Sequence, residues 1–125
     1  MIERLWITLA AVNLEAIVSF YTKVLGQDPD FYQVDRYAEF NLHHCRLGIF
    51  KPQRDQESLF APAATSPMSL CLTVTDLEAS RVCLQQAGAS LGNTIVSSHG
   101  QEINAYDPLG NRIIIYQSNQ SKSIG

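Results

Sequence analysis

Hydrophobic and polar positions follow the same order twice along the chain. A short apolar run at residues 5–9 precedes a segment with helical spacing over residues 13–26, and residues 69–74 precede a similar segment over residues 76–88. Each segment begins with Asn or Asp, which can accept hydrogen bonds from free amides at a helix start. Each ends with glycine, which adopts the left-handed conformation common after a helix. The pattern predicts two helices, each preceded by a buried strand.

Further strand-like runs follow each predicted helix. In order along the chain they are residues 31–34, 37–42, 46–50, 94–97, 102–106 and 112–117. A tight turn with proline and glycine at residues 107–111 joins the last two. The predicted order is βαβββ, linker, βαβββ, with module one at 1–50, the linker at 51–66 and module two at 67–118. Residues 119–125 form a polar tail. We read this repeat as two copies of one structural unit.

Strand alternation predicts that each sheet has two unlike faces. One set of positions is aliphatic and suits packing under the helices: Leu5, Ile7, Leu9, Leu70, Leu72, Val74, Ile113 and Ile115. The other set mixes aromatic, cationic and small polar groups: Trp6, Thr8, Arg46, Phe50, Ser69, Cys71, Arg112, Ile114 and Tyr116. Small-molecule pockets are mostly apolar with a few oriented polar groups. The second set is therefore the candidate ligand-binding surface. The alternative is that its aromatic residues fill the concave side of the sheets or contact another subunit.

Composition narrows the classes of partner. The 125 residues are 46% hydrophobic and 17% charged, with a net charge of −3 and no basic face, so we expect no nucleic acid partner. No apolar run is long enough to span a membrane, and no signal-peptide pattern opens the chain. Cys45, Cys71 and Cys83 cannot all pair. Reduced thiols are typical of cytosolic proteins, so we expect a cytoplasmic location.

Other reactive side chains give weaker indications. His43, His44 and Cys45 are types that bind transition metals, but three adjacent residues cannot converge on one ion without an unusual turn. A polar hairpin tip is the favoured interpretation there, and a surface loop is favoured for His99. Cys71 would need a neighbouring base to become a reactive thiolate, so we expect it to be buried by packing.

Several motifs resemble one known superfamily. In chain order they are Val12-Asn13-Leu14-Glu15, Ser19-Phe20-Tyr21, Val24-Leu25-Gly26, Val74-Thr75-Asp76-Leu77, Gln86-Ala87-Gly88 and Tyr106-Asp107-Pro108-Leu109-Gly110-Asn111. Together they are similar to the vicinal oxygen chelate superfamily, which includes glyoxalase I, extradiol dioxygenases, fosfomycin-resistance enzymes and bleomycin-resistance proteins. The resemblance covers roughly residues 1–118. It implies an α+β fold in which two βαβββ modules pair into a curled mixed sheet with a concave cleft, and it adds Glu102 and Asn104 to the candidate ligand contacts.

The resemblance also implies where a metal would bind. Enzymes of the superfamily hold a divalent ion at four positions, which here fall on Trp6, Gly48, Ser69 and Ile114. Imidazole and carboxylate groups are the ligands such ions take. Three of these residues have no side chain that binds a metal, and serine is a poor neutral ligand. We therefore expect no metal and no other cofactor.

The expected function is binding of a small organic molecule in the concave cleft, as the resemblance to the bleomycin-resistance branch implies. Trp6 can stack on a planar ligand, and Arg46 and Arg112 can bind an anionic group. The alternative is a metal-dependent lyase or dioxygenase with atypical ligands. A third hypothesis is an interaction module whose cleft is closed by dimerisation. The resemblance further implies a homodimer.

Overall fold

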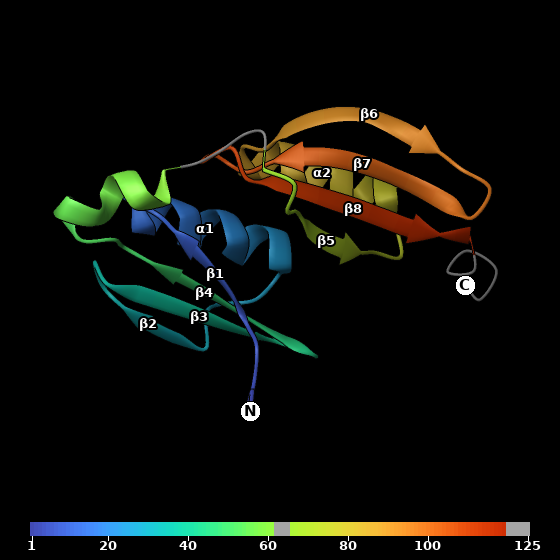
Figure 1. The fold of residues 1–125 in the computed structure, drawn as a ribbon. Coiled ribbons are helices and arrows are strands. Elements are labelled where there is room, and N and C mark those ends of the chain that lie inside the picture. Colours follow the sequence, from blue (N-terminus) through green and yellow to red (C-terminus); the bar gives the residue numbers. More distant parts are fainter. Residues whose placement is uncertain (62–65, 120–125) are drawn as a thin grey trace. The chain divides into compact units, whose positions relative to one another are not determined.

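The chain divides into two compact units in a computed structural model that describes residues 1–61 and 66–119 (Figure 1). The first unit spans Met1–Ala61 and the second spans Pro62–Gly125. Each unit contains a four-stranded mixed sheet and one α-helix. This is the predicted α+β class, with the βαβββ order present twice.

The first unit contains four strands, one α-helix and one 3-10 helix. These are β1 (Ile7–Ala10), α1 (Leu14–Leu25), β2 (Phe31–Gln33), β3 (Tyr37–Leu42), β4 (Cys45–Phe50) and the 3-10 helix η1 (Arg54–Phe60). The strand order in the sheet is β1-β4-β3-β2. β1 runs parallel to β4, whereas β3 is antiparallel to both of its neighbours.

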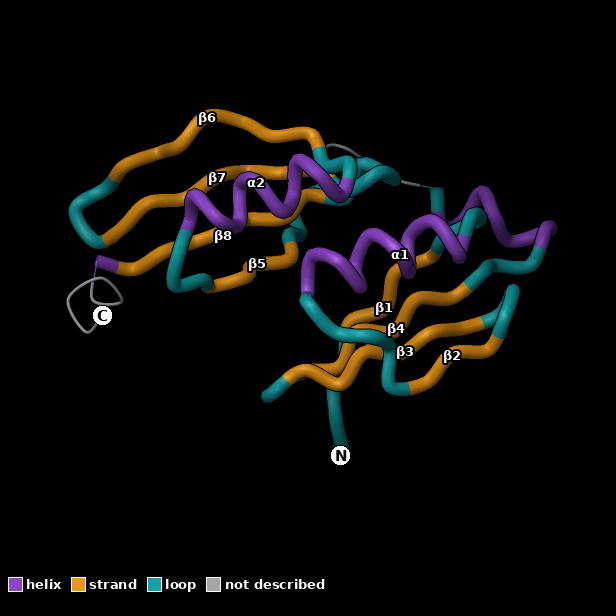
Figure 2. Tube along the Cα trace, turned by 180° about the vertical axis from the view of Figure 1, so that it is seen from behind, coloured by secondary structure: helices purple, strands orange, loops and turns teal. Residues whose placement is uncertain are grey.

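Helix α1 begins and ends at the predicted residues. The Asn13 side chain accepts a hydrogen bond from the Ala16 amide, and Gly26 follows the helix with a φ of 70°. The helix covers one face of the sheet (Figure 2). The core contains apolar side chains of α1, β3 and β4: Leu14, Ile17, Val18, Phe20, Tyr21, Ala38, Phe40, Leu47 and Ile49. The opposite face of this sheet carries the candidate site residues.

The second unit repeats the arrangement. Its elements are β5 (Leu70–Thr73), α2 (Leu77–Ala87), β6 (Ser90–Val96), β7 (Gly100–Tyr106) and β8 (Arg112–Ser118), and the strand order is β5-β8-β7-β6. β5 is parallel to β8, and the remaining pairs are antiparallel. The core is formed by Leu77, Leu84, Ile103, Ala105, Ile113 and Ile115. Asp76 caps α2 through the Ala79 amide.

The structure differs from the sequence expectations at several places. Leu5 was expected under a helix, but it precedes β1 and its side chain is 82% exposed. The predicted linker contains η1, and its residues 62–65 lie outside the described part of the chain, as do residues 120–125 of the predicted tail. β6 and β7 begin earlier than expected. Among residues 1–61 and 66–119, no helix is long and apolar enough to cross a membrane.

Candidate functional site

The first sheet has one face that α1 leaves uncovered, which we call the first open face. The register places on it Thr8, Ala10, Tyr37, Glu39, Asn41, Arg46, Gly48 and Phe50. Trp6 lies one residue before β1 and is 41% exposed. Three predicted residues, Thr8, Arg46 and Phe50, therefore belong to one surface of one unit, and Trp6 lines a hollow together with Asn41 and Arg46. Their shared surface follows from the period of two along a strand.

A hollow of about 390 Å³ lies beside Trp6 and is called here the Trp6 hollow. It is lined by Arg4, Leu5, Trp6, Asn41, Leu42, His44, Cys45 and Arg46. The guanidinium carbon of Arg4 lies 5.8 Å from the centre of the Trp6 ring, which is within the range of a cation–π contact. The lining contains two arginines and an indole but no carboxylate. Such a surface favours an anionic ligand with a flat apolar part.

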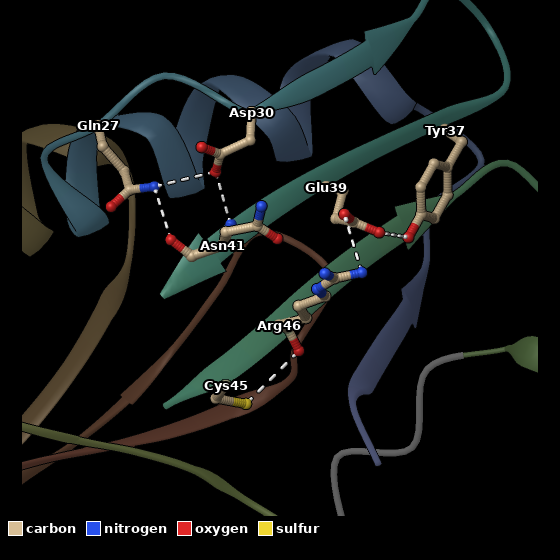
Figure 3. A network of polar contacts seen from close by, with 7 residues as sticks. All are labelled: Gln27, Asp30, Tyr37, Glu39, Asn41, Cys45 and Arg46. Carbon is tan, nitrogen blue, oxygen red and sulfur yellow. Dashed lines mark hydrogen bonds and ion pairs between the residues drawn. The ribbon is translucent and has the colours of Figure 1, made fainter. Parts of the chain in front are cut away.

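Arg46 is held by a short polar network on the first open face (Figure 3). One of its guanidinium nitrogens lies 3.7 Å from the Glu39 carboxylate. The other carboxylate oxygen of Glu39 accepts a hydrogen bond of 2.9 Å from the Tyr37 hydroxyl. Glu39 thus restrains both neighbours. At 41% exposure the Arg46 side chain still reaches solvent, so its remaining donors are accessible to a ligand.

Burial raises the pKa of the Tyr37 hydroxyl, and the hydrogen bond to Glu39 together with the Glu39 charge raises it further, against the opposing effect of Arg46. Tyr37 is therefore a neutral hydrogen-bond donor over the physiological range. Its ring lies over Gly48, where a Cβ atom would be 2.6 Å from the tyrosine hydroxyl oxygen. Tyr37 requires a glycine at that position of β4.

Another set of contacts fixes the β3 end of this network (Figure 3). The Asp30 carboxylate accepts a 2.6 Å hydrogen bond from the backbone N–H of Asn41. The backbone N–H of Asp30 donates to the Glu39 carbonyl over 2.8 Å. The Gln27 side-chain amide lies 3.4 Å from both the Asp30 carboxylate and the Asn41 carbonyl. The loop after α1 is thereby joined to β3. Phe50, in contrast, packs edge-to-face on Phe60 of η1 and serves in part as filler.

The second sheet presents the corresponding uncovered surface, the second open face. It carries Cys71, Thr73, Glu102, Asn104, Tyr106, Arg112, Ile114 and Tyr116. Ser69 lies one residue before β5, as Trp6 does before β1. The seven candidate residues of this module, Ser69, Cys71, Glu102, Asn104, Arg112, Ile114 and Tyr116, thus gather along one surface of the second unit.

Arg112 is engaged within the second unit. Its Nε donates to the Ser69 hydroxyl over 2.6 Å, and one terminal nitrogen donates to the carbonyls of Ser66 and Met68 over 2.5 and 3.3 Å. These bonds join the end of β8 to the segment before β5. Within residues 1–61 and 66–119, the second terminal nitrogen of Arg112 has no hydrogen-bond partner, and Arg46 has no comparable set of backbone partners.

Tyr116 makes contacts that the sequence did not indicate. Its hydroxyl oxygen lies 2.9 Å from His99 Nδ1 and donates a hydrogen bond of 3.1 Å to the His99 carbonyl. Its ring covers Gly100, where a Cβ atom would lie 2.7 Å from the hydroxyl oxygen. His99 therefore belongs to the surroundings of Tyr116. Cys71 was expected to be buried, but it is exposed because it points to the open face of an edge strand.

The residues at the four expected metal positions do not fit a divalent cation. Gly48 and Ile114 lie within β4 and β8 on the open faces, and Trp6 and Ser69 lie just before β1 and β5. Only Ser69 carries a donor atom, and that oxygen already accepts from Arg112. Residues 1–61 and 66–119 contain no cluster of three or more His, Cys, Asp or Glu side chains that could hold a metal ion.

Sequence reasoning missed Arg4, Tyr37, Glu39 and Asn41. The signal for the last three was present, because alternation along residues 37–42 puts them on one face. The two-residue turn at His43 and His44 then sets the register that pairs Asn41 with Arg46 and Glu39 with Gly48. For Arg4 no periodic pattern exists, since it precedes the first strand.

A sequence model of the glyoxalase/bleomycin resistance protein/dioxygenase superfamily matches residues 4–115. The chain belongs to this superfamily, which is the vicinal oxygen chelate superfamily indicated by its motifs. No curated protein sequence gives a significant match.

Several solved structures share this fold. A hypothetical protein, SA1046 from S. aureus, superposes with a TM-score of 0.76 at 18% identity, covering 94% of this chain and 95% of that one. A glyoxalase-related enzyme from Fulvimarina pelagi gives 0.76 at 23% identity, with 94% and 89% covered. The fosfomycin resistance protein FosX from Listeria monocytogenes gives 0.75 at 14% identity, with 98% and 99% covered. At these identities the likeness shows the fold alone.

Proposed function

We propose that this chain binds a small, planar organic anion at the Trp6 hollow and that binding requires no catalytic metal. The observation that carries the proposal is the lining of this hollow, which combines Arg4, Trp6 and Arg46 with no carboxylate. The relatives include a glyoxalase-related enzyme and fosfomycin resistance proteins, so a small-molecule ligand fits the family. The poor donor set at the expected metal positions supports binding rather than metal chemistry.

The chemistry of the hollow defines the ligand class. An aromatic ring stacked on Trp6 contributes about 0.5–1.5 kcal/mol beyond burial of its area. A carboxylate beside it accepts charge-assisted hydrogen bonds from Arg46, whose position Glu39 restrains. Arg4 adds a second positive charge close to the same ring. An aromatic carboxylate satisfies all three groups, and its neutral amide analogue loses the charge-assisted bonds.

Intrinsic fluorescence tests the proposal directly, because Trp6 is the sole tryptophan. We expect aromatic carboxylates from a metabolite library to change Trp6 emission in a saturable manner. Calorimetry should show that Arg46→Ala lowers the affinity for these ligands about tenfold or more, since hydrogen bonds to charged groups are worth about 1.5–3 kcal/mol. Trp6→Ala should lower the affinity for both the carboxylates and their amides. Lys23→Ala is the control that removes one positive charge elsewhere in the unit.

Two outcomes contradict binding at the Trp6 hollow. If no compound in the library binds saturably, the pocket loses its support. If Trp6→Ala and Arg46→Ala leave the affinity of a ligand unchanged, that ligand binds elsewhere. Arg112→Ala tests whether the second open face contributes to the same ligand. A loss of affinity in this variant, with the melting temperature retained, assigns a ligand contact to Arg112. If metal addition is needed for binding, the alternative of a metal-dependent lyase or dioxygenase replaces the proposal.

A further inference from the structure

We infer that the first unit carries a second anion site, distinct from the Trp6 hollow, that takes a phosphorylated polyol. A hollow of about 670 Å³ is lined by Val12, Asp35, Arg36, Lys51, Pro52, Gln53, Arg54 and Glu57 and is called here the Lys51 hollow. It shares no lining residue with the Trp6 hollow. Its volume lies within the range of small-molecule pockets, which is about 300–1,000 Å³.

Three separate segments bring positive charges to the Lys51 hollow. Arg36 ends the turn between β2 and β3, Lys51 directly follows β4, and Arg54 begins η1. The backbone holds these segments together, because the Lys51 amide donates a 2.9 Å hydrogen bond to the Arg36 carbonyl. Pro52, which separates Lys51 from Arg54, is buried. The convergence therefore depends on the fixed backbone and not on flexible side chains alone.

The turn that positions Arg36 is itself well defined. Asp35 has a φ of 63°, and the Arg36 amide donates to the Gln33 carbonyl over 3.0 Å. Aspartate is among the few non-glycine residues that adopt this left-handed conformation readily. The turn directs the chain back into β3 and leaves Asp35 and Arg36 exposed at the hollow.

The positive charges of this hollow are not neutralised in pairs. Among the described residues, Arg36, Lys51 and Arg54 form no ion pair, unlike Arg46 and Arg81. With three cations and the two carboxylates of Asp35 and Glu57, the lining carries a net charge of +1, whereas the whole chain carries −3. Guanidinium groups bind phosphate oxygens in a bidentate manner, and an ammonium adds a point charge.

The other lining groups narrow the ligand class. Asp35 and Glu57 also face the hollow, and carboxylates repel an anion but accept hydrogen bonds from hydroxyl groups. Val12 and Pro52 supply an apolar contact for a carbon skeleton. A ligand with a phosphate at one end and hydroxyls along a short chain uses all of these groups. A simple inorganic anion uses only the cations.

Amide NMR spectra of the full chain, titrated with glycerol phosphate and with inorganic phosphate, test the inference. We expect saturable shifts for the amides of Asp35, Arg36, Gln53 and Arg54, with glycerol phosphate binding more tightly. Lys51→Gln and Arg54→Gln should each weaken both ligands about fivefold, the equivalent of about 1 kcal/mol for an exposed charge. Lys23→Gln, the charge-matched control, and Trp6→Ala should leave both affinities unchanged. Lys23, Lys51 and Arg54 are exposed charged side chains, so replacing each by glutamine should leave the fold intact.

A separate variant tests the role of the Glu57 carboxylate. Glu57→Gln should strengthen binding of inorganic phosphate, because it removes a repelling charge, and should narrow the preference for glycerol phosphate. The proposed site is wrong if Lys51→Gln and Arg54→Gln leave the amide shifts and affinities unchanged, or if the wild-type chain shows no saturable shifts. Equal affinity for the two ligands in the wild-type chain overturns the assignment of a polyol. Because Trp6→Ala spares this site, its failure is separable from failure of the proposed function.

Discussion

At the scale of single residues, Tyr37 packs directly over Gly48 on the neighbouring strand. The Tyr37 ring occupies the space where a side chain at position 48 would begin, with 2.6 Å between its hydroxyl oxygen and an added Cβ. Gly48→Ala should therefore displace the ring, disrupt its bond to Glu39 and destabilise the chain by about 1–3 kcal/mol. Chemical denaturation of the two chains measures this difference.

The cause is tested by a double-mutant cycle. In a Tyr37→Ala background the obstructing ring is gone, so Gly48→Ala should cost much less than in the wild-type chain. Residues in contact show such coupling, whereas distant residues do not. An equal cost in both backgrounds would contradict the packing argument and would point to the backbone of β4 instead.

Tyr37 should also titrate at a higher pH than an ordinary tyrosine. Burial and the Glu39 carboxylate raise its pKa, so ionisation is less favourable in the folded chain than in the unfolded chain. The resulting stability is present below the unfolded pKa and is lost as pH rises through the folded pKa. Tyrosinate absorbance should show one late component that Tyr37→Phe removes and Glu39→Gln shifts to lower pH. A late component that persists in Tyr37→Phe belongs to another tyrosine.

Residue-level prediction succeeded where a period governs the position. Alternation put Thr8, Arg46 and Phe50 on one face, and the register agrees. It failed for Leu5, because the period was extended past the start of β1, and for Cys71, whose open face was taken for a packed surface. The contact between His99 and Tyr116 joins a loop to β8 and leaves no trace in any periodic pattern.

At the scale of elements, capping residues and turns defined most boundaries. Asn13, Gly26, Asp76 and Gly88 act at the predicted helix ends. The 3-10 helix η1 was missed, because residues 54–60 are mostly polar and exposed and lack the apolar spacing of an amphipathic helix. The starts of β6 and β7 were placed too late, since Gly92 and Gly100 interrupt the strand-like composition without interrupting the strands.

The contribution of the β7–β8 turn to stability can be measured. The buried Asp107 carboxylate accepts hydrogen bonds from the amides of Leu109 and Asn111 and from the Asn111 side chain. Asp107→Ala should destabilise the chain by about 2–3 kcal/mol, because it leaves these donors unsatisfied. Asp107→Asn keeps one carbonyl oxygen and should cost less. Thermal and chemical unfolding measure both variants. A cost for Asp107→Ala within experimental error of zero would mean that the turn is held by its backbone bonds alone.

At the scale of the whole molecule, both units expose large apolar side chains. Phe31, Val34, Leu59 and Val96 are each about half exposed or more. Association of two copies through isologous contacts would bury such groups, so we expect a homodimer. Light scattering over a range of concentrations should give twice the mass of the 13.9 kDa chain. A concentration-independent monomer mass contradicts this expectation.

The metal content of the purified chain separates metal-independent binding from the alternative of a metal-dependent lyase or dioxygenase. Hard and borderline cations need carboxylate or imidazole ligands, whereas Trp6, Gly48, Ser69 and Ile114 occupy the expected positions. Elemental analysis of dialysed protein should therefore show no stoichiometric divalent ion. A ligand that binds only the folded chain raises its melting temperature, so zinc, manganese and EDTA should all leave that temperature unchanged. About one Ni, Zn, Fe or Mn per chain, or a melting temperature that falls with EDTA and recovers with metal, would contradict metal-independent binding and restore the lyase or dioxygenase hypothesis.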